Sequence, residues 1–440
     1  MAAPLTDPAR ALRGWYLYGF ASQPFPTLVV TVFMSRYLTS VTENAVGKQG
    51  RVHVLGVPIA PGSLFAYTVS ASTVVLVVLM PLVGALADRT GRKRDIMLGS
   101  GAVGALACVL MVFVGRTDWQ LGAALFALAF LGYSCSIVVS YSLLVDLSTA
   151  EERDHASSRG WALAYLGGAI PLAIAFAVSP ALDKAVLARG ALCAAGIWWL
   201  GFSGPVRRRL PARMGRGEAG PAGRSLVGVG FRQLAATLRH ARGYPITLAF
   251  LVAFLVYNDG IQTVVTVSAQ YGDKELRLSD TVLLSGILLV QFVAFAGALG
   301  LGRLAYRFGA KRVVLASLVV WLGAVGGAYL LQAGVAWQFY LLAVVIALVL
   351  GGSQALSRAL FSRLIPAGAE AQYFGFYEIS DAGTSWLGPL LFGLAYQNSG
   401  SYRTALASLV VFFVAGFVLL ARVPVRRGIH AAGNDAPARV

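Results

Sequence analysis

Long apolar runs constrain the fold of this chain more than any other feature of its sequence. About twelve runs are long enough to cross the hydrocarbon core of a membrane as helices. Lipid offers the backbone no hydrogen-bond partner, so runs of this kind must form helices. The predicted spans are 12–38, 63–87, 95–115, 119–145, 159–180, 184–204, 243–269, 280–304, 312–332, 336–358, 373–397 and 402–423.

The composition also indicates a polytopic membrane protein. Of the 440 residues, 57% are hydrophobic and only 12% are charged, whereas a soluble domain carries about 25% charged residues. The net charge of +17 is also typical of nucleic-acid-binding proteins. Here, however, most basic residues lie in short segments between apolar runs, where they set membrane topology. We therefore expect no nucleic-acid partner.

Lys and Arg residues are distributed unequally between the two sides of the membrane. With the N-terminus inside, the inner segments carry 27 of them and the outer segments carry 8. This asymmetry predicts an even number of spans with both termini cytoplasmic. We expect a multi-pass monomer in the cytoplasmic (inner) membrane, with its basic segments near anionic inner-leaflet lipids.

One long break divides the predicted spans into two groups of six. Residues 205–241 are basic and rich in Gly and Pro, which predicts a cytoplasmic linker. The linker separates an N-terminal six-helix half, 1–204, from a C-terminal six-helix half, 242–427. Residues 428–440 are predicted to form a disordered tail.

The second part of the linker has an amphipathic pattern. Val227, Phe231, Leu234 and Leu238 share one face of a candidate helix, with arginines elsewhere. This pattern indicates either a helix on the inner membrane surface or a solvated linker with local helix.

A duplicated loop relates the two groups of spans. Residues 84–94 read GALADRTGRKR between spans 2 and 3, and residues 302–312 read GRLAYRFGAKR between spans 8 and 9, 218 residues later. Internal duplication around a long central loop is typical of transporters. The glycines allow two helices to meet at a tight turn, and the arginines hold the loop near anionic lipid.

The loop resembles the signature loop of the major facilitator superfamily, G-x-x-x-D-R-x-G-R-[RK]-[RK]. The resemblance implies an all-α fold of about twelve transmembrane helices in two pseudo-symmetric halves. It also implies a gating role for the loop residues Asp88, Arg89, Gly91 and Arg92. The second copy departs from the pattern, because Tyr306 stands where the acid would be. If that acid latches one conformation, the C-terminal half lacks the equivalent latch.

Four longer motifs are YNDGIQTV (257–264), SRGWALAYLGG (158–168), GGSQALSRALFSRLIP (351–366) and FGFYEISDAGTSWLGPLLFG (374–393). They are similar to motifs of the vacuolar amino-acid effluxer-like branch of this superfamily, the autophagy-related permeases with bacterial relatives. One stretch departs from that branch. Its members carry a YDxAN pattern early in helix 1, whereas this chain has YGFAS, so any coupling role of that acid cannot be carried over.

In the superfamily's fold, helices 1, 4, 7 and 10 line a central cavity, and here these spans carry polar residues deep in apolar runs. Asp259, Gln262 and Thr263 share one face of helix 7, and Gly260 is expected to loosen that helix. A carboxyl group at membrane depth is costly unless it faces a cavity or a partner. Asp259 is therefore the first candidate for binding a cationic group or carrying a proton; the alternative is a structural hydrogen bond that locks helix 7 to a neighbour. The candidates for substrate binding or coupling are Ser22, Gln23, Tyr141, Tyr257, Asn258, Asp259, Gln262, Thr263, Gln354 and Ser357.

Two further groups of charged residues lie toward the inner ends of the predicted helices. Glu378 and Asp381 are spaced i, i+3 in helix 11, with Arg358 of helix 10 as a candidate partner. Arg159 and Asp146 lie at matching ends of helices 5 and 4. Each group is interpreted either as a gate whose ion pair breaks during transport or as a permanent charge network near the interface.

Enzyme and pump motifs are absent from the sequence. It contains no P-loop, HExxH, CxxC or G-x-S-x-G pattern, and its Cys and His residues show no metal-ligand spacing. We expect no enzyme activity, no cofactor and no metal. The prediction is a secondary active transporter that moves a small solute by alternating access. Amino acids, moved by export, are the leading candidate substrate, and protons are a candidate coupling ion. The alternatives are a lipid, amphiphile or drug transporter of the same fold, and a non-transporting membrane sensor or scaffold.

Overall fold

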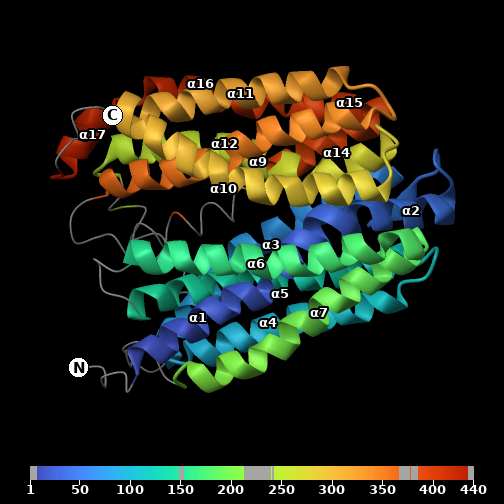
Figure 1. The fold of residues 1–440 in the computed structure, drawn as a ribbon, viewed down its shortest axis with the longest axis horizontal. Coiled ribbons are helices and arrows are strands. Elements are labelled where there is room, and N and C mark those ends of the chain that lie inside the picture. The colour runs from blue at the N-terminus through green and yellow to red at the C-terminus, as the bar shows by residue number, and fades with distance from the viewer. Residues whose placement is uncertain are drawn as a thin grey trace. The chain divides into compact units, whose positions relative to one another are not determined.

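A computed structural model describes residues 7–147, 153–212, 242–365 and 385–434, together with positions 239 and 377. Most of these residues are helical (Figure 1). The chain divides into two compact units, Met1–Leu234 and Ala235–Val440.

The first unit is a helical bundle in which α4 packs against α5 and α7, and α1 packs against α6 and α7. Two short strands, β1 (Val52–Val54) and β2 (Val57–Ile59), form an antiparallel hairpin between α2 and α3. The helices are α1 (Pro8–Ser22), η1 (Phe25–Met34), α2 (Ser35–Val46), α3 (Pro61–Thr90), α4 (Lys93–Leu110), η2 (Met111–Phe113), α5 (Trp119–Leu147), α6 (Arg153–Val178), η3 (Ser179–Ala181) and α7 (Lys184–Arg209).

The first predicted span contains a ten-residue π-helix, η1. Pro24 and Pro26 lie at its start, and proline removes a backbone donor from the regular i→i−4 ladder. The Thr31 hydroxyl donates to the Pro26 carbonyl oxygen at 2.9 Å, five residues back. The wider turn therefore begins where the prolines interrupt the α-helical hydrogen bonds, and π-helical segments are frequent at functional sites.

The second unit is also a helical bundle. In it, α9 packs against α16, and α12 packs against both α10 and α11. The helices are α9 (Pro245–Lys274), α10 (Asp280–Phe308), α11 (Ala310–Leu330), α12 (Ala336–Arg363), α14 (Leu387–Ser399), α15 (Tyr402–Ser408), α16 (Val410–Arg422) and α17 (Val425–Ala431).

Within the described residues, ten helical segments are long and apolar enough to cross a membrane. Two of the twelve predicted spans are not among them. The span predicted at 63–87 lies in α3, of which Pro61–Val77 counts as a shorter apolar helix. The span predicted at 373–397 begins outside the described residues, and its described part is the 13-residue α14.

The end of the chain differs from the predicted disordered tail. Val425–Ala431 form α17, in which Ile429 is fully buried. The Asn434 side-chain amide donates to the carbonyl oxygens of Arg363 (2.9 Å) and Ile365 (2.7 Å). The last carbonyl groups of an α-helix have no partner within the helix. The tail therefore supplies a donor to Arg363, the last residue of α12, and to Ile365 just beyond it. The candidate amphipathic helix at 227–238 and the last residues, 435–440, lie outside the described residues.

Candidate functional site

A buried hydroxyl pair joins α9 to α12. The oxygen atoms of Tyr257 and Ser357 are 2.5 Å apart, and both side chains are buried. The Ser357 hydroxyl also donates to the Ser353 carbonyl oxygen at 2.6 Å, so Tyr257 is the donor within the pair. Two predicted site residues are therefore brought together, in a position that solvent does not reach.

An accessible amide pair lies close by on the same two helices. The Gln354 amide nitrogen donates to the Gln262 side-chain oxygen at 3.4 Å. Gln262 is exposed and Gln354 is half-buried. Each amide group has two donors and an acceptor with two lone pairs, so this single contact leaves hydrogen-bonding capacity for a ligand.

Asp259 and Thr263 face α14, whereas Gln262 is exposed, so the predicted common face is divided. The Asp259 side chain is buried, and its Oδ2 accepts the backbone N–H of Gly388 at 2.8 Å, in the first turn of α14. A carboxylate at a helix N-terminus satisfies an orphan donor and complements the helix dipole. This geometry corresponds to the structural alternative stated for Asp259, a lock between two helices.

Two glycines at this interface allow close helix packing. A Cβ at Gly388 would lie 2.9 Å from Asp259 Oδ1, and closer still to the Thr263 hydroxyl. A Cβ at Gly260 would lie 2.9 Å from the Phe412 Cβ in α16. α9 is continuous from Pro245 to Lys274, so the expectation that Gly260 loosens it is wrong. The neighbouring Asn258 is also buried.

In the first unit, the predicted site residues lie against their own bundle. Ser22 is buried, with its hydroxyl 3.5 Å from the Gly19 carbonyl oxygen. Gln23 lies against α6, where a Cβ at Gly168 would be 3.2 Å from the Gln23 Cγ. Tyr141 is partly buried against the core that contains Trp15. These contacts lie within the first unit, as the α9–α12 contacts lie within the second.

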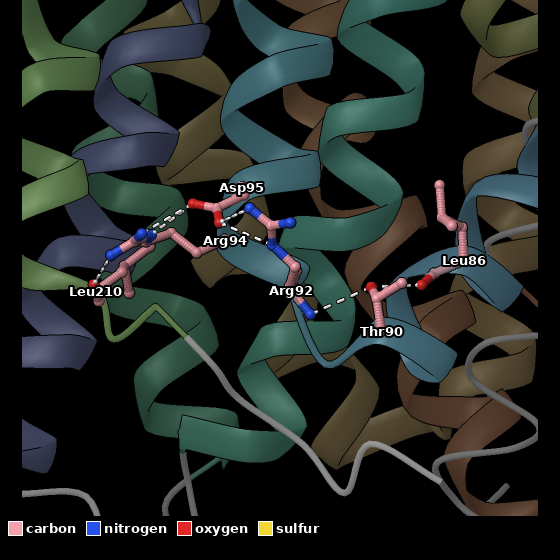
Figure 2. A network of polar contacts seen from close by, with 6 residues as sticks. All are labelled: Leu86, Thr90, Arg92, Arg94, Asp95 and Leu210. Carbon is pink, nitrogen blue, oxygen red and sulfur yellow. Dashed lines mark hydrogen bonds and ion pairs between the residues drawn. The ribbon is translucent and has the colours of Figure 1, made fainter. Parts of the chain in front are cut away.

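The signature loop between α3 and α4 is a tight turn with side-chain caps (Figure 2). Gly91 has a left-handed φ of 62°, and its N–H donates to the Ala87 carbonyl oxygen at 3.1 Å. The Thr90 hydroxyl donates to the Leu86 carbonyl oxygen at 2.7 Å and accepts the Arg92 N–H at 3.3 Å. The glycine is required because other residues pay a steric cost at positive φ.

Asp95, which we did not predict as a site residue, organises the basic end of this loop. It pairs with Arg92 at 3.2 Å and with Arg94 at 2.8 Å (Figure 2). Arg94 also donates to the Leu210 carbonyl oxygen at 3.2 Å, at the end of α7. The sequence feature that could have indicated this role is an acidic residue in the first turn of a helix, directly after a run of basic residues.

The second copy of the loop makes a similar connection by a different side chain. Gly309, between α10 and α11, has a φ of 94°. The Lys311 ammonium group donates to the carbonyl oxygens of Ala421 (2.9 Å) and Val423 (2.8 Å), at the end of α16. In each unit, a basic residue at the start of the third long helix (α4 or α11) therefore caps the C-terminal end of the last long helix (α7 or α16). The helix dipole favours a positive charge at that end.

At the other end of α4 and of α11, a tyrosine from the first span of the same unit forms a hydrogen bond. The Tyr37 hydroxyl donates to the Val114 carbonyl oxygen at 2.7 Å, just after η2. The Tyr271 hydroxyl donates to the Ala328 carbonyl oxygen at 2.5 Å, near the end of α11. The third helix of each unit is therefore tied at both ends to other helices of that unit.

The remaining predicted gating residues are only partly described. Arg358 lies in α12 and is half-buried. Six other side chains lie outside the part of the chain that the structure describes: Asp88, Arg89, Asp146, Arg159, Glu378 and Asp381.

Residues 7–433 match the family model described as "Vacuole effluxer Atg22 like". The chain belongs to this family. The MFS-type transporter YxiO of Bacillus subtilis is 30% identical over 435 residues, which cover 97% of this chain and 98% of that protein. Autophagy-related protein 22 of Yarrowia lipolytica is 27% identical over 463 residues, which cover 86% of this chain and 78% of that protein.

Solved structures of similar fold are also transporters. A D-xylose-proton symporter has a TM-score of 0.69 at 13% identity, covering 96% of this chain and 98% of that chain. The nucleoside transporter NupG has a TM-score of 0.62 at 12% identity, covering 98% of this chain and 100% of that chain. This Atg22-type chain is thus a multi-pass membrane transporter with the major facilitator fold, and not an enzyme. The predicted family and fold are confirmed.

Proposed function

We propose that this Atg22-type transporter binds a small polar solute at the α9–α12 amide pair and exports it by alternating access. The observation that carries the proposal is the contact between Gln262 and Gln354, which leaves amide groups accessible on two helices of the cavity-lining set. Uncharged amides recognise solutes by hydrogen bonds to donors and acceptors alike. Amino acids present both kinds of group, and the effluxer description of the family favours export.

Alternating access requires each half to move as one body. The hydrogen bonds at both ends of α4 and α11 support movement of each half as one body, because they oppose separation of the helices within a unit. We propose two halves, 1–204 and 242–427, joined by the linker 205–241. The charged pairs predicted near the inner helix ends are proposed as gates between the two states.

We propose protons as the coupling ion, with Asp259 as the group that carries them. Protonation would neutralise the carboxylate that faces the α14 N-terminus and weaken the contact with the Gly388 N–H. Proton binding would thereby change the coupling between α9 and α14.

The proposed setting is the cytoplasmic (inner) membrane, with a monomer whose two termini are cytoplasmic. The basic inner segments would contact anionic lipids of the inner leaflet.

The test is transport of labelled amino acids into proteoliposomes, with and without a pH gradient. Gln262→Ala and Gln354→Ala are each expected to raise the half-saturating concentration about 2- to 10-fold, the cost of one hydrogen bond. Gln332→Ala, at an exposed amide of the same unit, is the matched control and should leave transport unchanged. Asp259→Asn should lose the part of transport that the pH gradient drives.

Each outcome bears on a different part of the proposal. If the wild-type protein moves no amino acid, the substrate class is wrong, and lipids and amphiphiles are tested in the same vesicles. If the wild-type protein transports but all three glutamine variants behave alike, the amide pair is not the binding site.

A further inference from the structure

We propose that an anionic phospholipid binds along the seam between α1 and α7, with its phosphate held by arginines at one end. The α1–α7 seam is defined here by Arg10, Arg13 and Phe20 of α1 and by Trp198, Gly201 and Arg208 of α7. The inference is independent of the solute that the protein transports, because it concerns the outer surface of a single unit.

The two helices are in close contact along the seam. A Cβ at Gly14 would lie 2.9 Å from the Arg209 Cβ, so the N-terminal part of α1 and the C-terminal part of α7 approach closely. Further along, the Trp198 indole N–H donates to the Phe20 carbonyl oxygen at 3.4 Å. In Figure 1, α1 and α7 are neighbours within their bundle.

The middle of the seam is an apolar surface open to its surroundings. The rings of Phe20, Trp198 and Phe202 form a cluster with centroid distances of 5.3, 5.0 and 4.9 Å. Ile197 is 58% exposed, and a Cβ at Gly201 would meet no atom within 4 Å. In a membrane-spanning helix, such a surface faces lipid acyl chains.

The end of the seam is strongly basic. Arg10 and Arg13 of α1 are exposed, as are Arg207, Arg208 and Arg209 in the last turn of α7. The Arg10 guanidinium donates to the Arg208 carbonyl oxygen at 3.4 Å, so the two groups of arginines are adjacent. The nearby Asp7 carboxylate already accepts the Arg10 N–H at 2.9 Å, as the cap of α1.

The spacing of these two surfaces fits one amphiphile. Phe20 follows Arg13 by seven residues and Arg10 by ten, which corresponds to about 10 to 15 Å along a helix. Half of a bilayer's hydrocarbon core is about 15 Å thick. A phosphate at the arginines would therefore place acyl chains against the aromatic cluster. A soluble anion would use only the basic end, which is why the adjoining apolar surface favours a lipid.

The experiment measures phospholipid binding to the purified full-length protein by native mass spectrometry, with phosphatidylglycerol and phosphatidylcholine as probes. We expect phosphatidylglycerol to bind more tightly. Arg10→Gln combined with Arg208→Gln should weaken its binding at least about tenfold, because each basic residue near an anionic surface contributes severalfold to affinity. The matched control is Arg426→Gln with Arg427→Gln, which removes the same charge from exposed positions of α17 and should leave binding unchanged.

A second variant separates the seam from general electrostatic attraction. Gly201→Phe fills the open position and keeps every arginine, so it should weaken phosphatidylglycerol binding without changing the thermal unfolding midpoint. The proposal is overturned if Gly201→Phe binds like the wild type, or if both double variants lose affinity equally. It is also overturned if inorganic phosphate displaces the lipid at equal concentration, since the site would then recognise phosphate alone.

Discussion

At the scale of single residues, Asp259 shows how a buried carboxyl group is stabilised within an apolar helix that is long enough to span a membrane. Its oxygen accepts a backbone N–H at the start of α14, and Gly388 brings the two backbones close enough for that bond. A buried charge is costly unless it is paired or hydrogen-bonded. The partner here is a helix terminus, which offers an orphan donor and a favourable dipole together.

Replacement of Asp259 should separate the effect of its oxygen from that of its charge. Asp259→Ala leaves the buried Gly388 N–H without its acceptor and should lower the free energy of unfolding by about 1 to 3 kcal/mol. Asp259→Asn keeps an oxygen acceptor and should lose less than about 1 kcal/mol. Thermal unfolding in detergent measures both variants, with the exposed Gln332→Ala as control. Equal losses for Asn and Ala would show that the charge, and not the acceptor, stabilises the contact.

At the scale of elements, helix ends are tied by side chains from other helices. Arg94 and Lys311 each cap the C-terminal end of the last long helix in their own unit. The two residues are not at equivalent positions of the duplicated loop, since Lys311 corresponds to Lys93. The connection is therefore similar in both units, although the side chain that makes it differs.

The Lys311 connection is testable against its neighbour in the chain. Lys311→Met removes two hydrogen bonds to the end of α16 and should lower the free energy of unfolding by about 1 kcal/mol, a modest value because the site is partly exposed. Arg312→Met removes the same charge from the next, exposed residue and should stay within about 0.5 kcal/mol of the wild type. Chemical unfolding monitored by circular dichroism compares the two. Equal effects would indicate that only net charge matters.

The terminal helix α17 makes a second prediction at this scale. A chain that ends after Asn434 keeps the buried Ile429 and both amide contacts to the end of α12. A chain that ends after Arg427 loses them and should be less stable by about 2 to 4 kcal/mol. The difference between the thermal unfolding midpoints of the two truncated proteins measures this loss of stability. An unchanged midpoint for the shorter chain would mean that α17 does not stabilise the second unit.

At the scale of the whole molecule, the charge distribution predicts the membrane topology. Lys48 lies on the predicted outer side, and Arg209 lies on the predicted inner side; both are exposed. In a background without the native cysteines, Lys48→Cys should react with a membrane-impermeant maleimide in intact cells. Arg209→Cys should react only after permeabilisation. Labelling of Arg209→Cys in intact cells would contradict a cytoplasmic location for the end of α7.

Sequence patterns predicted the helices well and the contacts less well. The long apolar runs located most of the helices, because hydrocarbon permits almost no other structure. The spacing of Asp259, Gln262 and Thr263 predicted a common face, but the structure buries two of them and exposes the third. Asp95 escaped prediction because an acid in the first turn of a helix is also common where it has no partner.

By itself, the sequence determined the membrane-spanning class, the duplicated loop and the family resemblance, since these depend on composition, periodicity and repeated motifs. Only the tertiary structure decided which polar residues are accessible and which hold helices together. It placed the Asp259 side chain of α9 against the start of α14, left Gln262 and Gln354 accessible, and folded residues 425–431 into α17. The physical reason is that a helix end or a neighbouring backbone can satisfy a polar side chain as well as a solute can. Which partner is present depends on contacts between segments far apart in the chain.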